Sequence, residues 1–336
     1  MEFTITNPLG EEQGTLKEIE YLDIDIGNTN VFNLHIQENE YDPELHTKGC
    51  RIYVPGTELG GEIGYRNPIT ANKQIKIRGY TWYGIIDKEI VEPPAGQDYL
   101  YVEGEGNQVL KSLFLDKYGT FVRVSEEDSG INVPRQTVNR YIHMLDACRN
   151  IFTSLGARLK LVYEPGVANQ TGYLVASIVA ITDYSDTQEF SDDGKLNYNI
   201  VINEMGVNHL ICLGKGELKD RVVVHLYVWP DGTIKRTRYY TGLAERKEIY
   251  EYSSIESPDE LAKEGTKKLR ELMSKTSFKV SVSDEVNLEI GDIVGGRDRI
   301  TNTLVKAPVI SKIYKRQGAE EHITYKLEGE DENNAG

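Results

Sequence analysis

The sequence predicts a mainly β protein with some α-helix, of the α+β class. Short stretches of alternating apolar and polar residues recur along most of the 336 residues, and turns rich in glycine, proline or asparagine separate them. Two longer stretches carry an apolar stripe at helical spacing. Strands this short and regularly spaced favour a small barrel or a sandwich over a parallel sheet. The length allows roughly two or three domains.

Composition and charge limit the range of functions. Charged residues make up 27% of the chain and hydrophobic residues 39%, which is typical of a folded protein. The formal net charge of -15 argues against stable nucleic-acid binding over a broad surface, because such binding neutralises phosphates. No apolar run approaches the roughly 18–20 residues of a membrane span, and the first ten residues do not resemble a signal peptide. We therefore expect no membrane span, and synthesis in the cytoplasm.

The three cysteines predict buried thiols. Cys50, Cys148 and Cys212 are odd in number and far apart, and no CxxC pair occurs among them. Thiols that pack as small apolar side chains are the favoured interpretation.

The first predicted strand pair contains a motif that is also found in enzymes. Apolar and acidic residues alternate over residues 15–27, which predicts a strand with one buried face, and residues 31–37 return after a turn. The sequence DIGNT (residues 25–29) matches the phosphate-binding signature of type III pantothenate kinases, and GGRDR (295–299) echoes their second motif. That fold needs a near-continuous apolar strand here, and the two motifs stand too far apart. A nucleotide-dependent kinase therefore remains a minor alternative.

The next part of the chain predicts short strands and one short helix. Proline turns at residues 55–56, 67–68 and 93–94 separate the segments. The predicted strands cover residues 50–54, 62–66, 74–82, 83–91 and 98–103, and the predicted helix covers residues 107–115.

A long helix is predicted to begin at Pro134 and to end at Gly156. Proline favours a first helical turn, and an apolar stripe follows it. The stripe consists of Val138, Tyr141, Ile142, Leu145, Cys148, Phe152 and Leu155. His143 and Asp146 on the other face could form an acid–base pair, but no nucleophile or metal-spaced partner joins them. A solvated polar face is therefore favoured.

An acidic loop interrupts the strands predicted at residues 159–163, 173–182 and 196–203. It contains Asp183, Asp186, Asp192 and Asp193, whose oxygens suit weak calcium binding. The spacing differs from that of an EF-hand loop, so a solvated loop is the favoured interpretation.

Residues 209–242 predict a β-meander with a structural rather than a catalytic role. Strands are predicted at residues 209–213 and 218–229, with turns at 214–216 and 230–233, and residues 222–229 are apolar or aromatic on both sides of the second strand. The predicted return strand, residues 234–240, is unusually basic for this chain, which one solvated face would explain.

A second long helix begins with a capping box, in which Ser257 and Glu260 satisfy each other's backbone donors and Pro258 occupies the first turn. Gly295 and Gly296 indicate a hairpin or barrel corner, because a phosphate loop would lead into a helix. The strands predicted after this helix cover residues 278–282, 286–290, 293–294, 300–305 and 308–314. The acidic tail, residues 328–336, is expected to fray.

Several long segments carry a resemblance that spans nearly the whole chain and is strongest from about residue 141 to residue 326. They are LKEIEYLDIDIGNTN, GYTWYGIIDKEIVEPP, HLICLGKGELKDRVV, YYTGLAERKEIYEYS and EIGDIVGGRDRIT. Together they resemble the family of phage tail-tip and baseplate hub proteins of the siphovirus type, which also occur in phage-derived contractile particles (tailocins).

This resemblance implies a trimer in which each subunit carries two β-barrel domains similar to tail-tube proteins. Three copies would form a pseudo-six-fold ring that matches a hexameric tube on one side and a three-fold spike on the other. The implied domains are residues 1–123, a helix-containing middle region at 124–200, residues 201–329, and a flexible acidic tail at 330–336, with interleaving allowed.

The resemblance implies a non-enzymatic structural hub, made in the bacterial cytoplasm and assembled into a virion tail or a phage-like baseplate. Implied partners are the tail tube protein, the tape-measure protein, other distal tail or baseplate proteins, and a spike or tip protein. An acidic lumen would keep passing DNA from sticking. The alternatives are a tail-associated cell-wall hydrolase, although neither HExxH nor GxSxG occurs, the kinase, and a sugar-binding module built on the 21 tyrosines and two tryptophans. We expect no cofactor, and no residue is singled out as catalytic, cofactor-binding or metal-binding.

Overall fold

The structure, a computed structural model, describes residues 1–17, 19–167, 170–185, 196–282, 287–297 and 304–328. Strands predominate, as the sequence predicts. The chain forms two compact units: unit 1 combines Met1–Tyr198 with Val280–Glu328, and unit 2 is built on Asn199–Lys279. The chain enters unit 2 through β15 (Leu196–Asn203) and leaves it through β20 (Lys275–Val282), and these two strands pair with each other.

Unit 1 contains most of the strands. Before unit 2 these are β1 (Thr4–Thr6), β2 (Glu12–Thr15), β3 (Tyr21–Ile26), β4 (Val31–Gln37), β5 (Arg51–Tyr53), β6 (Gly60–Ile69), β7 (Gln74–Thr81), β8 (Ile90–Val91), β9 (Leu100–Glu105), β10 (Val122–Val124), β11 (Asn132–Val138), β12 (Ile142–His143), β13 (Ala157–Glu164) and β14 (Tyr173–Ala180). After unit 2 they are β21 (Ile293–Arg297), β22 (Leu304–Gln317) and β23 (Glu320–Leu327). The helical segments are α1 (Trp82–Ile86), α2 (Gly106–Phe114), α3 (Met144–Phe152), η1 (Glu38–Glu40), η2 (Thr70–Asn72) and η3 (Thr153–Leu155).

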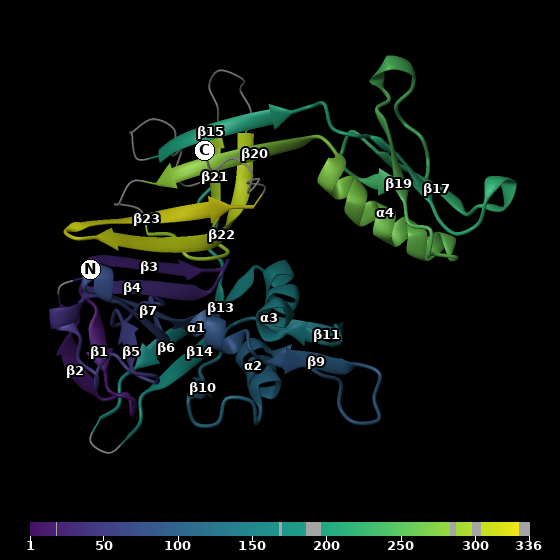
Figure 1. Cartoon of the computed structure of the whole chain (residues 1–336). Helices are drawn as coiled ribbons and strands as arrows, with labels where there is room; N and C mark the ends of the chain where they lie inside the picture. The colour runs from purple at the N-terminus through teal and green to yellow at the C-terminus, as the bar shows by residue number, and fades with distance from the viewer. Residues whose placement is uncertain (18, 168–169, 186–195, 283–286, 298–303, 329–336) are drawn as a thin grey trace. The chain divides into compact units, whose positions relative to one another are not determined.

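The largest sheet joins the two ends of the chain. Its strands follow the order β2-β1-β5-β6-β7-β4-β3-β22-β21, and β23 pairs with β22 as well. β22 runs antiparallel to β3, with Lys312 opposite Ile26 and Gln317 opposite Tyr21. The strands that follow unit 2 therefore complete a sheet that the first strands begin (Figure 1).

Alternating sequence produces the buried face of this sheet. In β4, Phe32, Leu34 and Ile36 are buried while the residues between them are half-buried, and the strand has the predicted bounds. Behind the sheet, the Trp82 ring of α1 stacks on Tyr163 of β13, with ring centroids 5.0 Å apart. The core of unit 1 thus joins the large sheet to the segment that carries β13.

The long helix predicted from Pro134 is only partly present. Pro134 lies in β11, where the pairing with β9 shifts register between Val133 and Gln136. Proline lacks an N–H donor and is tolerated at such a bulge, so the helical interpretation of Pro134 was wrong. Helix α3 begins later, at Met144, and Gly156 follows it in the left-handed conformation, as the predicted end requires.

Two further predictions fail for local reasons. The strand predicted at residues 83–91 is instead helix α1 up to Ile86, a turn, and the two residues of β8, because the Thr81 side chain accepts a hydrogen bond from Gly84 N and begins the helix. The proline turn at 67–68 does not end β6, in which Pro68 pairs with Ile75. β5 pairs only with residues 60–62 of β6, so Pro68 lies on an open edge where no donor is needed.

Unit 2 is a four-stranded sheet covered by one helix. The sheet has the order β18-β17-β16-β19, and β19 runs parallel to β16. Its elements are β16 (His209–Leu213), η4 (Leu218–Asp220), β17 (Val223–Val228), β18 (Ile234–Lys235), η5 (Gly242–Ala244), β19 (Lys247–Glu251) and α4 (Pro258–Leu272). The Ser257 side chain accepts a hydrogen bond from Glu260 N at 3.4 Å, which confirms the predicted helix start.

The return strand predicted at residues 234–240 shortens to the two residues of β18. The Thr237 carbonyl accepts the hydrogen bond of the Trp229 indole N–H at 3.0 Å, and the Arg238 guanidinium pairs with Glu245. Beyond Lys235 the segment bonds through side chains instead of a backbone ladder.

The remaining predictions concern closure of a sheet into a barrel, the strand predicted at residues 286–290, and residues outside the described ranges. Among the described residues no sheet closes into a barrel. Residues 287–290 form a loop rather than a strand, because Leu288 N donates to the Tyr325 hydroxyl and Glu289 N to the Asp292 carboxylate. Residues 300–303 and 330–336 lie outside the described residues, as do Asp186, Asp192 and Asp193. Where the chain is described, no helix is both long enough and apolar enough to span a membrane.

Candidate functional site

The DIGNT segment forms a hairpin turn in which neighbouring groups donate hydrogen bonds to the Asp25 carboxylate. One Asp25 carboxylate oxygen accepts hydrogen bonds from the Thr29 hydroxyl at 2.8 Å and from Thr29 N at 3.2 Å. The other accepts one from the Ser311 hydroxyl of β22 at 3.2 Å. Gly27 has a φ of +97°, and a Cβ there would lie 2.2 Å from the Ile310 carbonyl oxygen. The motif therefore fastens the β3–β4 turn to β22.

The glycines of the second kinase-like motif, GGRDR, also lie in a strand pair. Gly295 of β21 pairs with Lys306 of β22, and Gly296 pairs with Val305. Backbone amides in a strand ladder are bonded to their partner strand and do not converge on an anion, as those of a phosphate loop do.

His143 and Asp146 do not meet. His143 Nδ1 contacts the Asp87 carbonyl oxygen at 2.7 Å, and this bond, followed by the nearby Asp87 carboxylate, raises the pKa of His143. Asp146 pairs with Arg149 at 3.4 Å. In the acidic loop, the Asp183 carboxylate accepts hydrogen bonds from the Ser185 hydroxyl and from Ser185 N, the latter at 2.8 Å. These bonds close a local turn and lower the pKa of Asp183.

The cysteines are buried free thiols, as predicted. Burial raises the pKa of Cys148 to about 12 and that of Cys212 to about 11, so both stay protonated near neutral pH. No group of three or more His, Cys, Asp and Glu side chains in the described ranges could hold a metal ion.

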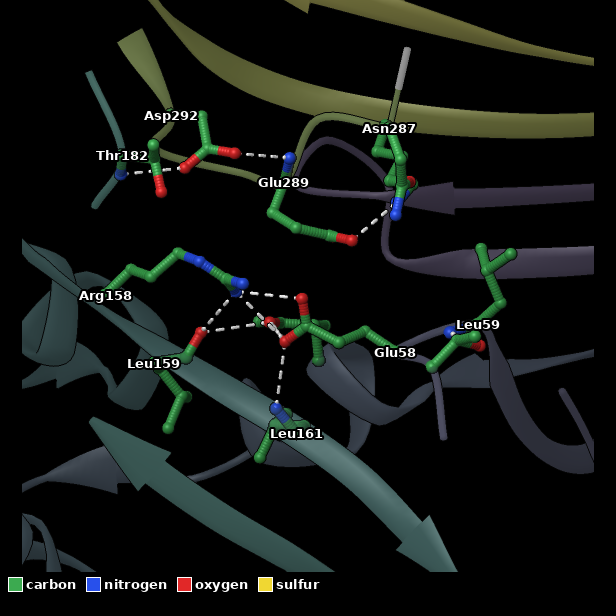
Figure 2. A network of polar contacts seen from close by, with 12 residues as sticks. Glu58, Leu59, Arg158, Leu159, Leu161, Thr182, Asn287, Glu289 and Asp292 are labelled. Carbon is green, nitrogen blue, oxygen red and sulfur yellow. Dashed lines mark hydrogen bonds and ion pairs between the residues drawn. The ribbon is translucent and has the colours of Figure 1, made fainter. Parts of the chain in front are cut away.

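A buried ionic network in unit 1 was not foreseen from the sequence (Figure 2). Its centre is Glu58, whose side chain is 7% exposed and contacts the Arg158 guanidinium at 2.8 Å. The same carboxylate accepts hydrogen bonds from the Tyr83 hydroxyl at 2.6 Å and from Leu161 N at 3.0 Å. Burial raises the pKa of the Glu58 carboxyl, and the Arg158 guanidinium opposes that rise.

The strands that follow unit 2 contribute the other side of the network. The Asp292 carboxylate accepts from Thr182 N at 3.0 Å and from Glu289 N at 2.8 Å. The Glu289 carboxylate in turn accepts from Lys312 Nζ at 2.9 Å. In Figure 2, Glu289 and Asp292 lie on the same side of Arg158. Three segments far apart in sequence thus meet around a few buried charges.

The contacts of this network join the three segments to one another. Arg158 holds the Glu58 carboxylate, backbone N–H groups hold Asp292, and Lys312 holds Glu289. Removing one partner would leave a buried charge unpaired, which is strongly unfavourable.

Unit 2 carries a second polar cluster around His209, which is 5% exposed. His209 Nδ1 lies 2.8 Å from a Glu245 oxygen, and His209 Nε2 lies 2.8 Å from His225 Nδ1. Because Nδ1 donates to the carboxylate, Nε2 of a neutral His209 is free to accept from His225. Arg238 and Lys247 also pair with Glu245, so the carboxylate is enclosed by positive groups.

Comparisons with known proteins bear on the fold. No family model matches the chain, and no curated protein is significantly similar to it in sequence. The 43 kDa tail protein of prophage MuSo2 from Shewanella oneidensis aligns over 97% of this chain and 98% of its own, with a TM-score of 0.52 and 11% identity. A chain of the phage P2 baseplate in its activated conformation with Ca aligns over 98% and 99%, with a TM-score of 0.54 and 10% identity. At these identities the likeness shows a common fold.

Proposed function

We propose that this chain is a structural component of a phage or phage-like tail and acts without catalysis. The observation that carries the proposal is the extent of the structural likeness, which covers 97–98% of the chain and almost the whole of two phage tail and baseplate chains. A match of this extent leaves little of the chain to form an additional catalytic domain. The roles of Asp25, His143 and Glu58 in turns and ion pairs agree with it.

Within the tail, we assign the chain to the hub at the distal end of the tube. Three copies would form a ring with two tube-like barrel domains each, drawn from residues 1–123 and 201–329, around the middle region at 124–200. The pairing of β22 with β3 supports an interleaved arrangement of these two domains. The ring would join the hexameric tube and the tape-measure protein to a three-fold spike or tip, alongside other baseplate proteins. It would be made in the bacterial cytoplasm and assembled into the tail.

The distribution of charge supports a passage that does not retain DNA. The first 50 residues carry 11 Asp and Glu against two Lys and Arg. An acidic lumen would repel phosphates and leave DNA free to move. We propose that unit 1 supplies this acidic surface.

Light scattering of the purified chain over a wide concentration range tests the ring. The expected result is a trimer, or a monomer that becomes a trimer as concentration rises. Electron microscopy of the trimer mixed with purified tail tubes should then show it at one end of the tube. A chain that stays monomeric and leaves the tube ends bare would contradict the hub.

A further inference from the structure

Lys312 is a buried lysine in the large sheet of unit 1. It is 5% exposed and lies between two strands, opposite Ile26 of β3 and opposite Tyr325 of β23. Lysine is almost never buried without a partner, because its ammonium group loses hydration there. Its Nζ lies 2.9 Å from a Glu289 carboxylate oxygen and 3.0 Å from the side-chain amide oxygen of Asn287. The amine therefore contacts both a carboxylate and a carboxamide.

The loop that carries Asn287 and Glu289 is held in place through its backbone. Leu288 between them is 1% exposed, and its N–H donates to the Tyr325 hydroxyl at 3.1 Å. Glu289 N donates to the Asp292 carboxylate at 2.8 Å. In Figure 2 the Glu289 carboxylate points toward Asn287. Contacts that fix two reacting groups in this way lower the entropic cost of a reaction between them.

We propose that Lys312 and Asn287 join covalently in an isopeptide bond, with Glu289 as the proton carrier. An amine attacks a carboxamide in its neutral form, and the carboxylate beside Nζ takes the ammonium proton. Nζ then bonds to Asn287 Cγ, which lies one bond beyond the amide oxygen that Nζ contacts. Glu289 gives its proton to Nδ2, the Cγ–Nδ2 bond breaks, and ammonia leaves, while the second amine proton passes through Glu289 to water. No oxidant, reductant or co-reactant takes part.

The contact of Asn287 with the amine favours this reaction over a simple ion pair. Glu289 alone would balance the charge of Lys312. Asn287 is exposed, so its amide has water as an alternative partner, yet it contacts the buried amine. Nucleophile, carboxamide and proton carrier are the groups that such an exchange of amides requires.

The bond would tie the loop before β21 to β22, across 25 positions of the sequence. A cross-link of this kind stabilises a fold mainly by restricting the unfolded chain. It forms once in each chain, without turnover. The inference goes beyond the proposed tail function and does not depend on it.

Mass spectrometry of the purified full-length chain tests the bond. Loss of ammonia should lower the intact mass by about 17 Da relative to the sequence. Trypsin should release residues 280–297 and 307–315 as one linked peptide, because the new amide prevents cleavage after Lys312. Fragmentation of that peptide locates the bond.

Four variants assign the roles of the three side chains. Asn287→Ala and Lys312→Arg should each restore the full mass, since one removes the carboxamide and the other the attacking amine. Glu289→Gln keeps the shape of the side chain but cannot take the proton, so most chains should remain unlinked. The matched control Lys315→Arg changes another lysine of β22 and should retain the mass deficit.

Three results would overturn the proposal. A wild-type mass that equals the sequence mass, and stays so after several days at neutral pH, would leave Lys312 as an ion-pair partner only. A deficit that persists in Asn287→Ala would place the reaction elsewhere in the chain. A loss of about 18 Da, which corresponds to water, would move the cross-link to the Glu289 carboxylate. Each result leaves the light-scattering test of the ring unaffected.

Discussion

Glu58 and Arg158 form an ion pair in which both side chains are almost buried, 7% and 12% exposed. Arg158→Met would leave the Glu58 carboxylate with no cation partner in a poorly solvated site. We expect the free energy of unfolding to fall by about 3–5 kcal/mol. Urea unfolding of the full chain measures it.

Two variants control this prediction. Lys111→Met removes an exposed pair with Glu126 and should change stability by no more than about 0.5 kcal/mol. The double variant Glu58→Gln/Arg158→Met removes both charges and should recover part of the loss. Equal effects of Arg158→Met and Lys111→Met would show that the network contributes little.

His209 should make unit 2 sensitive to mild acid. Burial lowers the pKa of His209 below its usual 6.5, and the Glu245 carboxylate opposes that shift only in part. The unfolded chain therefore takes up the proton first as pH falls. Stability is fully present above about pH 6.5 and declines below it. Urea unfolding followed by Trp229 fluorescence in a Trp82→Phe background, between about pH 7.5 and 5.5, measures this. His209→Gln should flatten the pH dependence, and an unchanged slope would exclude His209 as its source.

Contacts between individual side chains were the hardest feature to predict from the sequence. Glu58, Arg158 and Glu289 are separated by 100 positions or more and lie among ordinary strand residues. Nothing local distinguishes them from solvated charges, because their burial arises only when β13 and the loop before β21 pack together. The buried cysteines were predictable, since their isolation in the sequence already argued against pairing.

At the scale of elements, the approach of α4 to its sheet depends on Gly265. Alanine favours helix by about 1 kcal/mol over glycine, but its Cβ would lie 2.3 Å from Cys212 Sγ and 2.9 Å from Leu226 Cδ1. Overpacking of this kind costs about 1–3 kcal/mol, so Gly265→Ala should destabilise unit 2. Thermal unfolding measures the change. Cys212→Ala in the same chain should restore part of the loss, and Lys267→Ala on the exposed side of the helix should have little effect.

The elements that were predicted well are those with strong local signals. Apolar and polar residues alternate along β4, and Ser257 and Pro258 mark the start of α4. One prediction failed because Pro134 fits either a helix start or a strand bulge. Another failed because the residues after Thr81 are buried on most sides of the helix, which hides the helical period in the sequence. Pairing with β9, which sequence pattern does not contain, decided the first case, and the local Thr81 cap decided the second.

At the scale of the whole molecule, unit 2 is an insertion in the chain of unit 1. β15 and β20 pair with each other, so the two ends of the insertion are hydrogen-bonded neighbours. We expect unit 1 to fold when residues 204–274 are replaced by a short glycine–serine linker. Trp82 fluorescence should show a cooperative unfolding transition in this shortened chain. Loss of that transition would mean that unit 1 requires unit 2.

The pairing of β3 with β22 also has a consequence for synthesis. Asp25 and its partner Ser311 are 286 positions apart, which corresponds to roughly 14–57 s of translation at about 5–20 residues per second. Throughout that interval the nascent chain exposes a strand edge that nothing yet occupies. Asp23 and Asp25 place acids along this edge, and charges of this kind discourage pairing with foreign strands. Asp25, which belongs to the kinase-like DIGNT motif, and Asp23 would thus protect the nascent chain from aggregation until its last strands emerge.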